Sequence, residues 1–291
     1  MQFVQIVIGG ISQGFVYGLV ALGFVLIYKA TEAVNFAQGE LMMLGAFCGL
    51  ALATWAGLPY WAVLLGSVAI LAAFGFATEF VLLRPVFGEP SFSAIMVTIG
   101  LGFLARGLVT MIPGFGTDSH SLDAPFKGQV IEAGGLVIGM EHVVIIGAGL
   151  LLSATLYGLF RFTRIGIAMQ AVSQNQLAAW YVGIPVRRLN GLVWALSAAV
   201  AAVAGVLLAP IAFIHANMGF IGLKAFPAAV IGGFDSLPGA IAGGLILGVI
   251  EALAGFYLPE GFKDVAASVV VLVVLAVRPH GLFGQASRKR V

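Results

Sequence analysis

The stretch VQIVIGGISQGFVYGLVALGFVLIY, from Val4 to Tyr28, runs without a single charged residue. A bilayer core about 30 Å thick is crossed by about 20 apolar helical residues. The stretch is longer than the apolar part of a secretory signal peptide, which spans about 7–15 residues, and no basic residue precedes it. We therefore predict that it is a retained membrane-spanning helix.

The rest of the chain has the same apolar character. Of its 291 residues, 61% are hydrophobic and 9% are charged, whereas soluble domains average about 45–50% apolar and about 25% charged residues. A soluble fold cannot hide this much apolar surface, so we predict a single transmembrane domain over residues 1–291. The net charge of +2 gives no indication of a nucleic-acid partner, and the lone Cys48 excludes an internal disulfide.

Eight apolar runs are long enough to cross a bilayer. Their continuous apolar character favours helices over barrel strands, which alternate between apolar and polar residues. The predicted fold class is therefore all-α, a polytopic bundle of eight full transmembrane helices. The runs lie at roughly 4–28, 36–54, 61–83, 93–112, 141–160, 191–213, 239–258 and 262–278.

Basic residues in short loops predict the orientation of the bundle. Loop 161–190 contains four arginines and no acidic residue, so we place it in the cytoplasm. This places the N-terminus outside. The tail is basic as well and is predicted to be cytoplasmic, through Arg278, Arg288, Lys289 and Arg290.

Eight crossings from an outside N-terminus would leave the tail outside, so one further passage is needed. Segment 219–236 is apolar but short, and it contains Pro227. We predict a short broken helix there, because interrupted helices occur at membrane depth where they pack inside protein or line a cavity. The alternative is an interfacial loop with the tail outside.

Motifs for catalysis are absent or out of context. The sequence contains no G-x-x-x-x-G-K-[ST] motif for nucleotide binding. The G-x-S-x-G match at residues 10–14 lies at the start of a membrane helix, without the strand and turn that expose a nucleophile. The four histidines are scattered without metal-ligand spacing. We predict no catalytic residues, no metal and no cofactor, and a membrane enzyme is disfavoured.

Four charged residues fall within or near the ends of apolar runs, where each is costly. Arg106 and Glu79 are close enough to helix ends to reach the interface. Glu40 lies near the start of its run, and Glu251 lies closest to mid-membrane. For Glu251 we predict pairing with another polar group ahead of contact with a substrate.

Asn35, Gln38 and Gly39 open the second apolar run. Polar groups with small neighbours at a helix N-terminus can bind an anionic group such as a carboxylate. The same residues can instead cap the helix, since asparagine is a good N-cap. The residue types leave both readings open.

Within loop 161–190, residues 166–182 are compatible with a helix. The helix is predicted to end at Gly183-Ile184-Pro185, because glycine and a following proline are stop signals. It is flanked by arginines and would lie at the inner membrane surface, as a lipid-surface helix does. Its small alanines favour docking against a protein instead; they are Ala171, Ala178 and Ala179.

Several stretches, in order along nearly the whole chain, resemble the LivH-like permease subunits of branched-chain (hydrophobic) amino-acid ABC importers. The first two are YGLVALG at 17–23 and NFAQGE at 35–40. The others are AAWYVGI at 178–184, KAFPAAVIGGFDSLPGA at 224–240 and RPHGLFG at 278–284.

The resemblance implies a type II-like permease that forms half of a translocation path for branched-chain or hydrophobic amino acids in the bacterial inner membrane. It implies a second, LivM-like permease, two cytoplasmic ATPase subunits that bind the ATP, and a periplasmic substrate-binding protein that docks on 113–140 and 214–219. A permease for urea or short amides remains an alternative within the family, and a secondary transporter is an alternative outside it.

The resemblance also directs attention to two groups of residues. Where relatives often carry arginine, this chain has Ile167 and Gln170, which puts an ion pair with the ATPase in doubt but not the docking. The residues expected to couple to the ATPase are Gly166, Ala171, Asn175, Ala178, Ala179, Gly183 and Ile184. Those expected along the substrate pathway are Asn35, Gln38, Gly39, Phe226 and Glu251.

Overall fold

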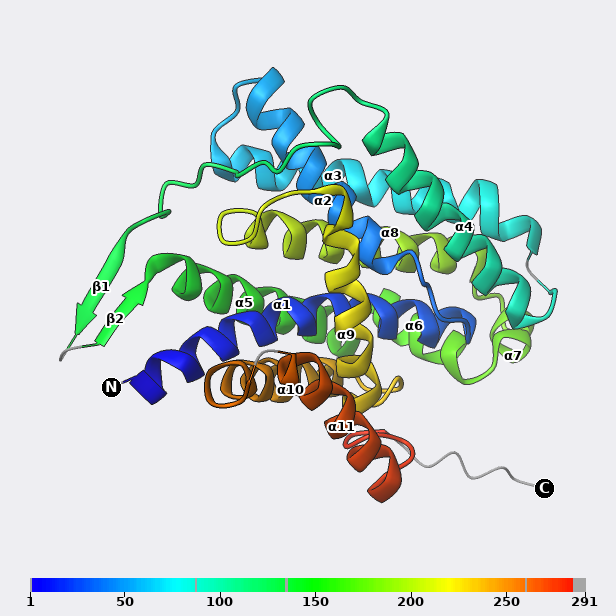
Figure 1. The fold of residues 1–291 in the computed structure, drawn as a ribbon. Coiled ribbons are helices and arrows are strands. Elements are labelled where there is room, and N and C mark those ends of the chain that lie inside the picture. The colour runs from blue at the N-terminus through cyan, green and yellow to red at the C-terminus, as the bar shows by residue number, and fades with distance from the viewer. Residues whose placement is uncertain (1, 87, 134–135, 260, 285–291) are drawn as a thin grey trace.

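The computed structural model describes residues 2–86, 88–133, 136–259 and 261–284, and these are mostly helical (Figure 1). Within them, six helices are long and apolar enough to cross a membrane, as expected for a multi-pass membrane protein. They are α1 (Gln2–Thr31), α4 (Ser91–Thr110), α5 (Met140–Phe162), α8 (Val186–Leu208), α10 (Leu237–Tyr257) and a Tyr60–Val86 unit. That unit joins α3 (Tyr60–Thr78), the π-helical η1 (Glu79–Leu83) and the 3₁₀ turn η2 (Arg84–Val86).

The other two predicted spans are shorter helices. Helix α2 (Gln38–Trp55) has 18 residues, and its first turn is polar because it contains Glu40. Helix α11 (Phe262–Val277) has 16 residues, fewer than the roughly 20 that cross a bilayer core without distortion. The basic residues 288–290 of the predicted cytoplasmic tail lie outside the described residues.

The predicted short helix near Pro227 is present as α9 (Gly219–Gly232), which has 14 residues. The prediction that this helix is broken is wrong, because α9 continues through Pro227 and ends at Gly233, whose φ is +94°. Proline removes one helical hydrogen bond, and packing against α1, α2 and α10 holds the helix together around that gap. In Figure 1, α9 crosses the long helices at a steep angle.

A small hairpin in loop 113–140 departs from the all-α prediction. Strands β1 (Val130–Ala133) and β2 (Leu136–Gly139) pair antiparallel, with Val130 opposite Gly139. Both strands are rich in valine, isoleucine and leucine, the first two of which favour extended backbone. The hairpin lies beside the N-terminus of α1 (Figure 1).

Helices α1 and α10 form the most extensive helix–helix contact in the described core, and glycines recur in both at four-residue spacing. They run antiparallel, and Gly10, Gly14 and Gly18 of α1 face Gly248, Gly244 and Ile241 of α10. A Cβ atom added to Gly14 would lie 2.8 Å from Leu245 Cα. The small residues therefore let the two backbones touch, which is how membrane helices gain packing energy in lipid.

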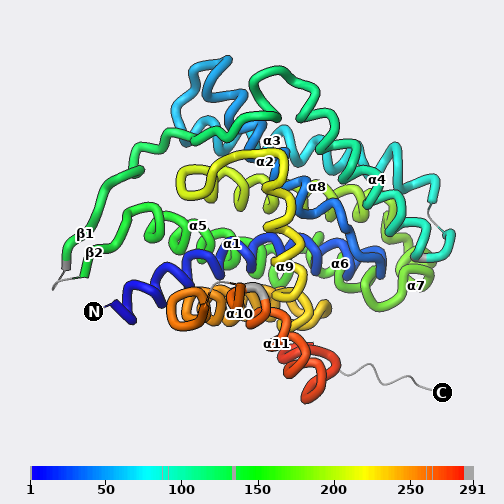
Figure 2. Tube along the Cα trace, viewed as in Figure 1, coloured from blue at the N-terminus to red at the C-terminus, as the bar shows by residue number. Residues whose placement is uncertain are grey.

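The segments predicted to be cytoplasmic meet at one end of the bundle. Gln176 Nε2 donates to Ala30 O at the end of α1 over 2.6 Å. Leu282 N donates to Ile231 O near the end of α9 over 2.8 Å. We call this the inner end; it appears on the right of Figure 2.

The segments predicted to be external meet at the opposite end. Gln5 Nε2 donates to Val137 O of the hairpin over 3.1 Å, and His120 forms an isolated antiparallel bridge with Ile214, beyond the end of α8. Since α9 ends at the inner end, segment 214–232 brings the chain back from one end of the bundle to the other.

Candidate functional site

The predicted helix at 166–182 is two helices rather than one. Helix α6 (Arg164–Gln174) and helix α7 (Gln176–Tyr181) are separated by Asn175, whose backbone is extended at φ −160°. The Oδ1 atom of Asn175 accepts the N–H of Ala178 over 2.9 Å. Asparagine thus ends one helix and caps the next, in the role for which its short acceptor side chain is preferred.

Helix α7 stops where the sequence predicts. Gly183 adopts φ +85° and donates its N–H to Trp180 O, while Ile184 donates to Ala179 O, both over 3.0 Å. This pair of bonds is a Schellman closure, which needs a residue able to adopt the left-handed region. Gly183 and Ile184 therefore shape the turn after α7.

The residues expected to couple to the ATPase do not share one surface. Gly166 is buried, and a Cβ there would lie 2.4 Å from Leu159 O of α5. Ala178 is exposed, and Ala171 is half-buried. Ala179 is only 4% exposed and belongs to the core. Ala179 is therefore placed to act by packing within the bundle, and its role in coupling to the ATPase stays a prediction.

Large apolar side chains cover the outer side of α7. Trp180 is 64% exposed, and its exposed neighbours complete a surface that we call the α7 patch: Leu177, Trp180, Tyr181 and Val182. The docking surface was predicted from the small alanines of this segment alone. An aromatic pair within an Arg-flanked segment also indicates an interaction surface.

Two glutamines fix this segment to the bundle. Besides Gln176, which bonds Ala30, Gln170 donates from Nε2 to Phe160 O at the end of α5 over 2.8 Å. Gln170 is one of the two positions where relatives often carry arginine. In this chain its side chain stiffens the α5–α6 corner, so a displacement of α7 would be transmitted to α1 and α5.

Two of the expected pathway residues form a fully buried polar cluster with Ser197 of α8. Asn35 Nδ2 donates to Gln38 Oε1 over 3.1 Å, and Ser197 Oγ lies 2.9 Å from the same oxygen. Asn35 Oδ1 also accepts the N–H of Ala37 over 3.0 Å. These bonds bind the linker between α1 and α2 to α8. The N-cap of α2 is Ala37 and has no side-chain capping bond, so Asn35 closes a turn in the linker rather than capping the helix.

Gly39 and Phe226 lie next to this cluster. A Cβ at Gly39 would be 2.1 Å from Gly219 O, so α2 and α9 touch backbone to backbone. The Phe226 ring packs against Phe24 and Phe36, with centroids 5.6 and 6.0 Å away. The structure thus brings four of the five expected pathway residues together.

Glu251, the fifth, lies apart from them on α10. Its buried carboxylate is 3.7 Å from Lys224 Nζ on α9 and 3.8 Å from Lys263 Nζ on α11. The predicted pairing of Glu251 with another polar group is present, and it links three helices.

A second ion pair joins α2 to α4. Glu40 pairs with Arg106, whose guanidinium lies 4.4 Å from the centroid of the Phe220 ring on α9. Arg106 therefore turns inward rather than toward the interface. Helix α4 has few other partners, and large apolar side chains such as Phe103 and Leu104 cover its outer face, so this pair is a main attachment of α4.

We predict that Glu40→Leu destabilises the protein by roughly 2–4 kcal/mol, because it leaves Arg106 charged and unpaired in a largely buried place. The double variant Glu40→Leu with Arg106→Leu should recover most of that loss. Thermal unfolding of the detergent-purified chain measures both. Equal stability of the single and double variants would show that the pair does not hold α4.

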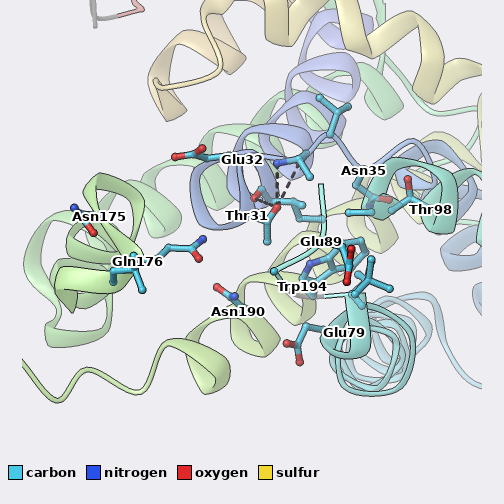
Figure 3. A pocket seen from close by; sticks show the side chains of 18 of the residues that line it. Thr31, Glu32, Asn35, Glu79, Glu89, Thr98, Asn175, Gln176, Asn190 and Trp194 are labelled. Carbon is cyan, nitrogen blue, oxygen red and sulfur yellow. Dashed lines mark hydrogen bonds between the residues drawn. The ribbon is translucent and has the colours of Figure 1, made fainter. Parts of the chain in front are cut away.

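An inner-end cavity of about 670 Å³ lies beside α7 (Figure 3). Its walls come from the α1–α2 linker, η1 and η2, the start of α4, the α6–α7 junction and α8. Asn190 and Trp194 of α8 also line the cavity, and neither was predicted as a site residue. They are four residues apart and therefore lie on one face of an apolar helix. This spacing of two side chains with polar atoms could have indicated the site. Among the described residues, no group of His, Cys, Asp or Glu is arranged to hold a metal ion.

The fold and these sites define a multi-pass helical membrane protein with two short capped helices, α6 and α7, at one end. Residues 6–277 match the sequence profile of a family described as "Branched-chain amino acid transport system / permease component". The chain belongs to this family, whose members are permease components of transporters.

Named relatives cover the chain from end to end. It is 33% identical over 309 residues to the high-affinity branched-chain amino acid transport system permease protein LivH of Salmonella typhimurium, covering 100% of this chain and 98% of the relative. It is 31% identical over 309 residues to BraD of Pseudomonas aeruginosa, with the same coverage. A probable LivH of Methanocaldococcus jannaschii is 28% identical over 95% of this chain and 91% of the relative.

Proposed function

We propose that this chain is the membrane-spanning permease subunit of an ATP-driven importer and forms half of a translocation path for branched-chain amino acids. The observation that carries the proposal is the family match over residues 6–277. The full-length similarity to permeases named for branched-chain amino acid transport supports the same substrate class. These relatives do not support the alternative, urea or a short amide, better than branched-chain amino acids.

The proposed assembly contains a second, LivM-like permease, two cytoplasmic ATPases that bind ATP, and a periplasmic binding protein, in a bacterial inner membrane. We propose that residues 1–291 form one transmembrane domain of type II-like architecture. Eight passages by the long and shorter helices, with α9 as the additional one, fit an outside N-terminus and an inside tail. The gathering of predicted cytoplasmic segments at the inner end supports this orientation.

In the proposed mechanism, closure of the ATPases upon ATP pushes on α7 through the α7 patch. Asn175 and the turn at Gly183 and Ile184 keep α7 a rigid unit. The bonds made by Gln176 and Gln170 pass the push to α1 and α5. Gly166, Ala171 and Ala179 act from the inner side by packing, whereas Ala178 faces outward.

The pathway is proposed to run beside α9, where Gly39 and Phe226 lie. Asn35 and Gln38 hold the adjoining linker in place, so their role on the pathway is positional. Phe226 is half-buried within an aromatic group, which suits the passage of an aliphatic side chain. Glu251 acts by fixing α9 between α10 and α11 rather than by touching the substrate.

A strain lacking this chain tests the substrate class. Restoring the gene should restore uptake of labelled leucine, and unlabelled isoleucine and valine should compete while urea should not. Restored uptake of urea or a short amide without leucine uptake would overturn the branched-chain proposal and favour the alternative.

A further inference from the structure

The inner-end cavity holds two buried side chains whose polar atoms lack partners. Asn190 and Trp194 are 1% and 2% exposed. Among the described residues, neither polar atom of the Asn190 amide nor Trp194 Nε1 has a hydrogen-bond partner. Both side chains line the cavity. Unmade hydrogen bonds at buried groups are costly, so a ligand that satisfies them would bind with a gain.

The charge lining the cavity is negative. Glu32, Glu79 and Glu89 line it, and no lysine or arginine is among its described lining residues. Arg84 pairs with Glu79 over 3.3 Å, whereas Glu32 and Glu89 form no ion pair with another described residue. These two carboxylates belong to exposed residues that line the cavity, and such an uncompensated pair favours a cationic group.

The lining also includes aliphatic side chains, among them Ile27, Val34 and Leu83. The cavity therefore offers carboxylates to an ammonium group, N–H donors to an oxygen acceptor, and apolar walls to a hydrocarbon chain. Figure 3 shows Asn190 and Glu79 on one side of the cavity and Thr31 and Glu32 on the other, with Gln176 and Asn175 closing a third side.

We propose that this cavity is a binding site, within a single subunit, for an ammonium-bearing ligand with an aliphatic tail, of which a free aliphatic amino acid is the simplest case. The part of the proposal that assigns it to the cytoplasm rests on the proposed function. Because Gln176 of α7 and Thr31 of the α1–α2 linker both line the cavity, a bound ligand bridges the coupling segment and the bundle. Occupancy therefore restrains α7, and internal amino acid slows import.

Binding is tested on the purified full-length chain in nanodiscs, without partners or ATP. Saturation-transfer NMR compares leucine, isoamylamine, which lacks the carboxylate, and 4-methylpentanoate, which lacks the ammonium. Leucine and isoamylamine should bind competitively, and 4-methylpentanoate should bind roughly tenfold more weakly. Equal binding of 4-methylpentanoate would show that the cavity recognises only the hydrocarbon chain, and it would overturn the proposal.

Two variants locate the binding. Asn190→Leu removes the unpartnered amide, and Ala94→Phe fills the cavity from α4. Each should weaken leucine binding by roughly tenfold. Met96→Phe adds the same ring to an exposed position of α4 and should leave binding unchanged. Unaltered binding in both cavity variants would contradict the site. Should Ala94→Phe fail to fold, Asn190→Leu decides the question, since its amide has no partner to lose.

The regulatory consequence is read from the reconstituted importer in inside-out vesicles. Isoamylamine added on the ATP side should slow transport of leucine supplied with the binding protein in the lumen, and Asn190→Leu should relieve that slowing. Normal transport that isoamylamine does not slow would overturn the regulatory role. An absence of any leucine transport by the unaltered importer would instead refute the proposed function, while the binding result would stand.

Discussion

Leucine in place of Gly14 is expected to lower the unfolding temperature of the membrane protein strongly, whereas leucine in place of Gly9 is expected to be tolerated. A Cβ at Gly14 would lie 2.8 Å from Leu245 Cα and 2.9 Å from Gly244 O, both backbone atoms that cannot rotate away. At Gly9, a Cβ meets nothing within 4 Å. Overpacking of a tight contact costs about 1–3 kcal/mol or more, and here the contact joins the two central helices.

The two variants are matched, since both replace a glycine of α1 with the same residue and gain the same helix propensity, about 1 kcal/mol. The measurement is the fraction of protein that stays monodisperse in size-exclusion chromatography after heating. Gly14→Leu should aggregate well below the temperature at which the parent does. Similar thermal curves for Gly14→Leu and Gly9→Leu would show that α1 and α10 do not pack through these glycines.

Replacing Trp180 with alanine is expected to abolish ATP-driven transport while leaving the fold intact. Trp180 is the largest side chain of the α7 patch and is 64% exposed, so its truncation removes contact area and little internal packing. Tryptophan is enriched among interface residues whose loss costs 2 kcal/mol or more, which corresponds to roughly 30-fold weaker docking. Co-purification with the ATPase should fall accordingly.

Trp55→Ala supplies the matched control. Trp55 is 70% exposed and is the last residue of α2, at the outer end, so its loss removes an equal ring from a surface away from α7. Pull-down of the ATPase and leucine uptake are measured for both variants. Intact docking in Trp180→Ala, or an equal loss of docking in Trp55→Ala, would contradict the assignment of the α7 patch as the surface that docks the ATPase.

Much of the bundle was predictable because lipid imposes one strong constraint on the chain. Every apolar run of the expected length became a helix, and the glycine spacing at Gly10 and Gly14 marked the central contact. The ends of elements were less predictable. Pro227 predicted a break, but tertiary packing keeps α9 continuous at this residue. Asn175 was predicted to lie within one helix, but it caps a second one.

The candidate sites were likewise predictable only in part. A helical segment at 166–182 was identifiable by its flanking arginines and stop signals, yet the side of α7 that faces outward was not. Ala179 and Trp180 are neighbours in sequence, and only tertiary packing decides that the alanine is buried and the tryptophan exposed. Arg106, the partner of Glu40, and Ser197, one partner of Gln38, come from distant helices, so no local pattern predicts these two contacts.

The cavity was the least predictable feature. Asn190 and Trp194 carry a local signal, but Glu32, Glu79 and Gln176 reach the same space from separate segments. Their convergence depends on the turn between α1 and α2, on the π-helical end of α3, and on the bond between Gln176 and Ala30. Such long-range placement lies beyond what spacing along the chain encodes.

Leucine flux in proteoliposomes is the most direct test of the claim that this chain is a passive path driven by partner ATPases. The purified chain alone, under an imposed proton or sodium gradient, should carry no leucine. The same chain reconstituted with its permease partner, ATPases and loaded binding protein should transport leucine only when ATP is present. Leucine flux by the chain alone, driven by an ion gradient, would contradict the account and identify a secondary transporter.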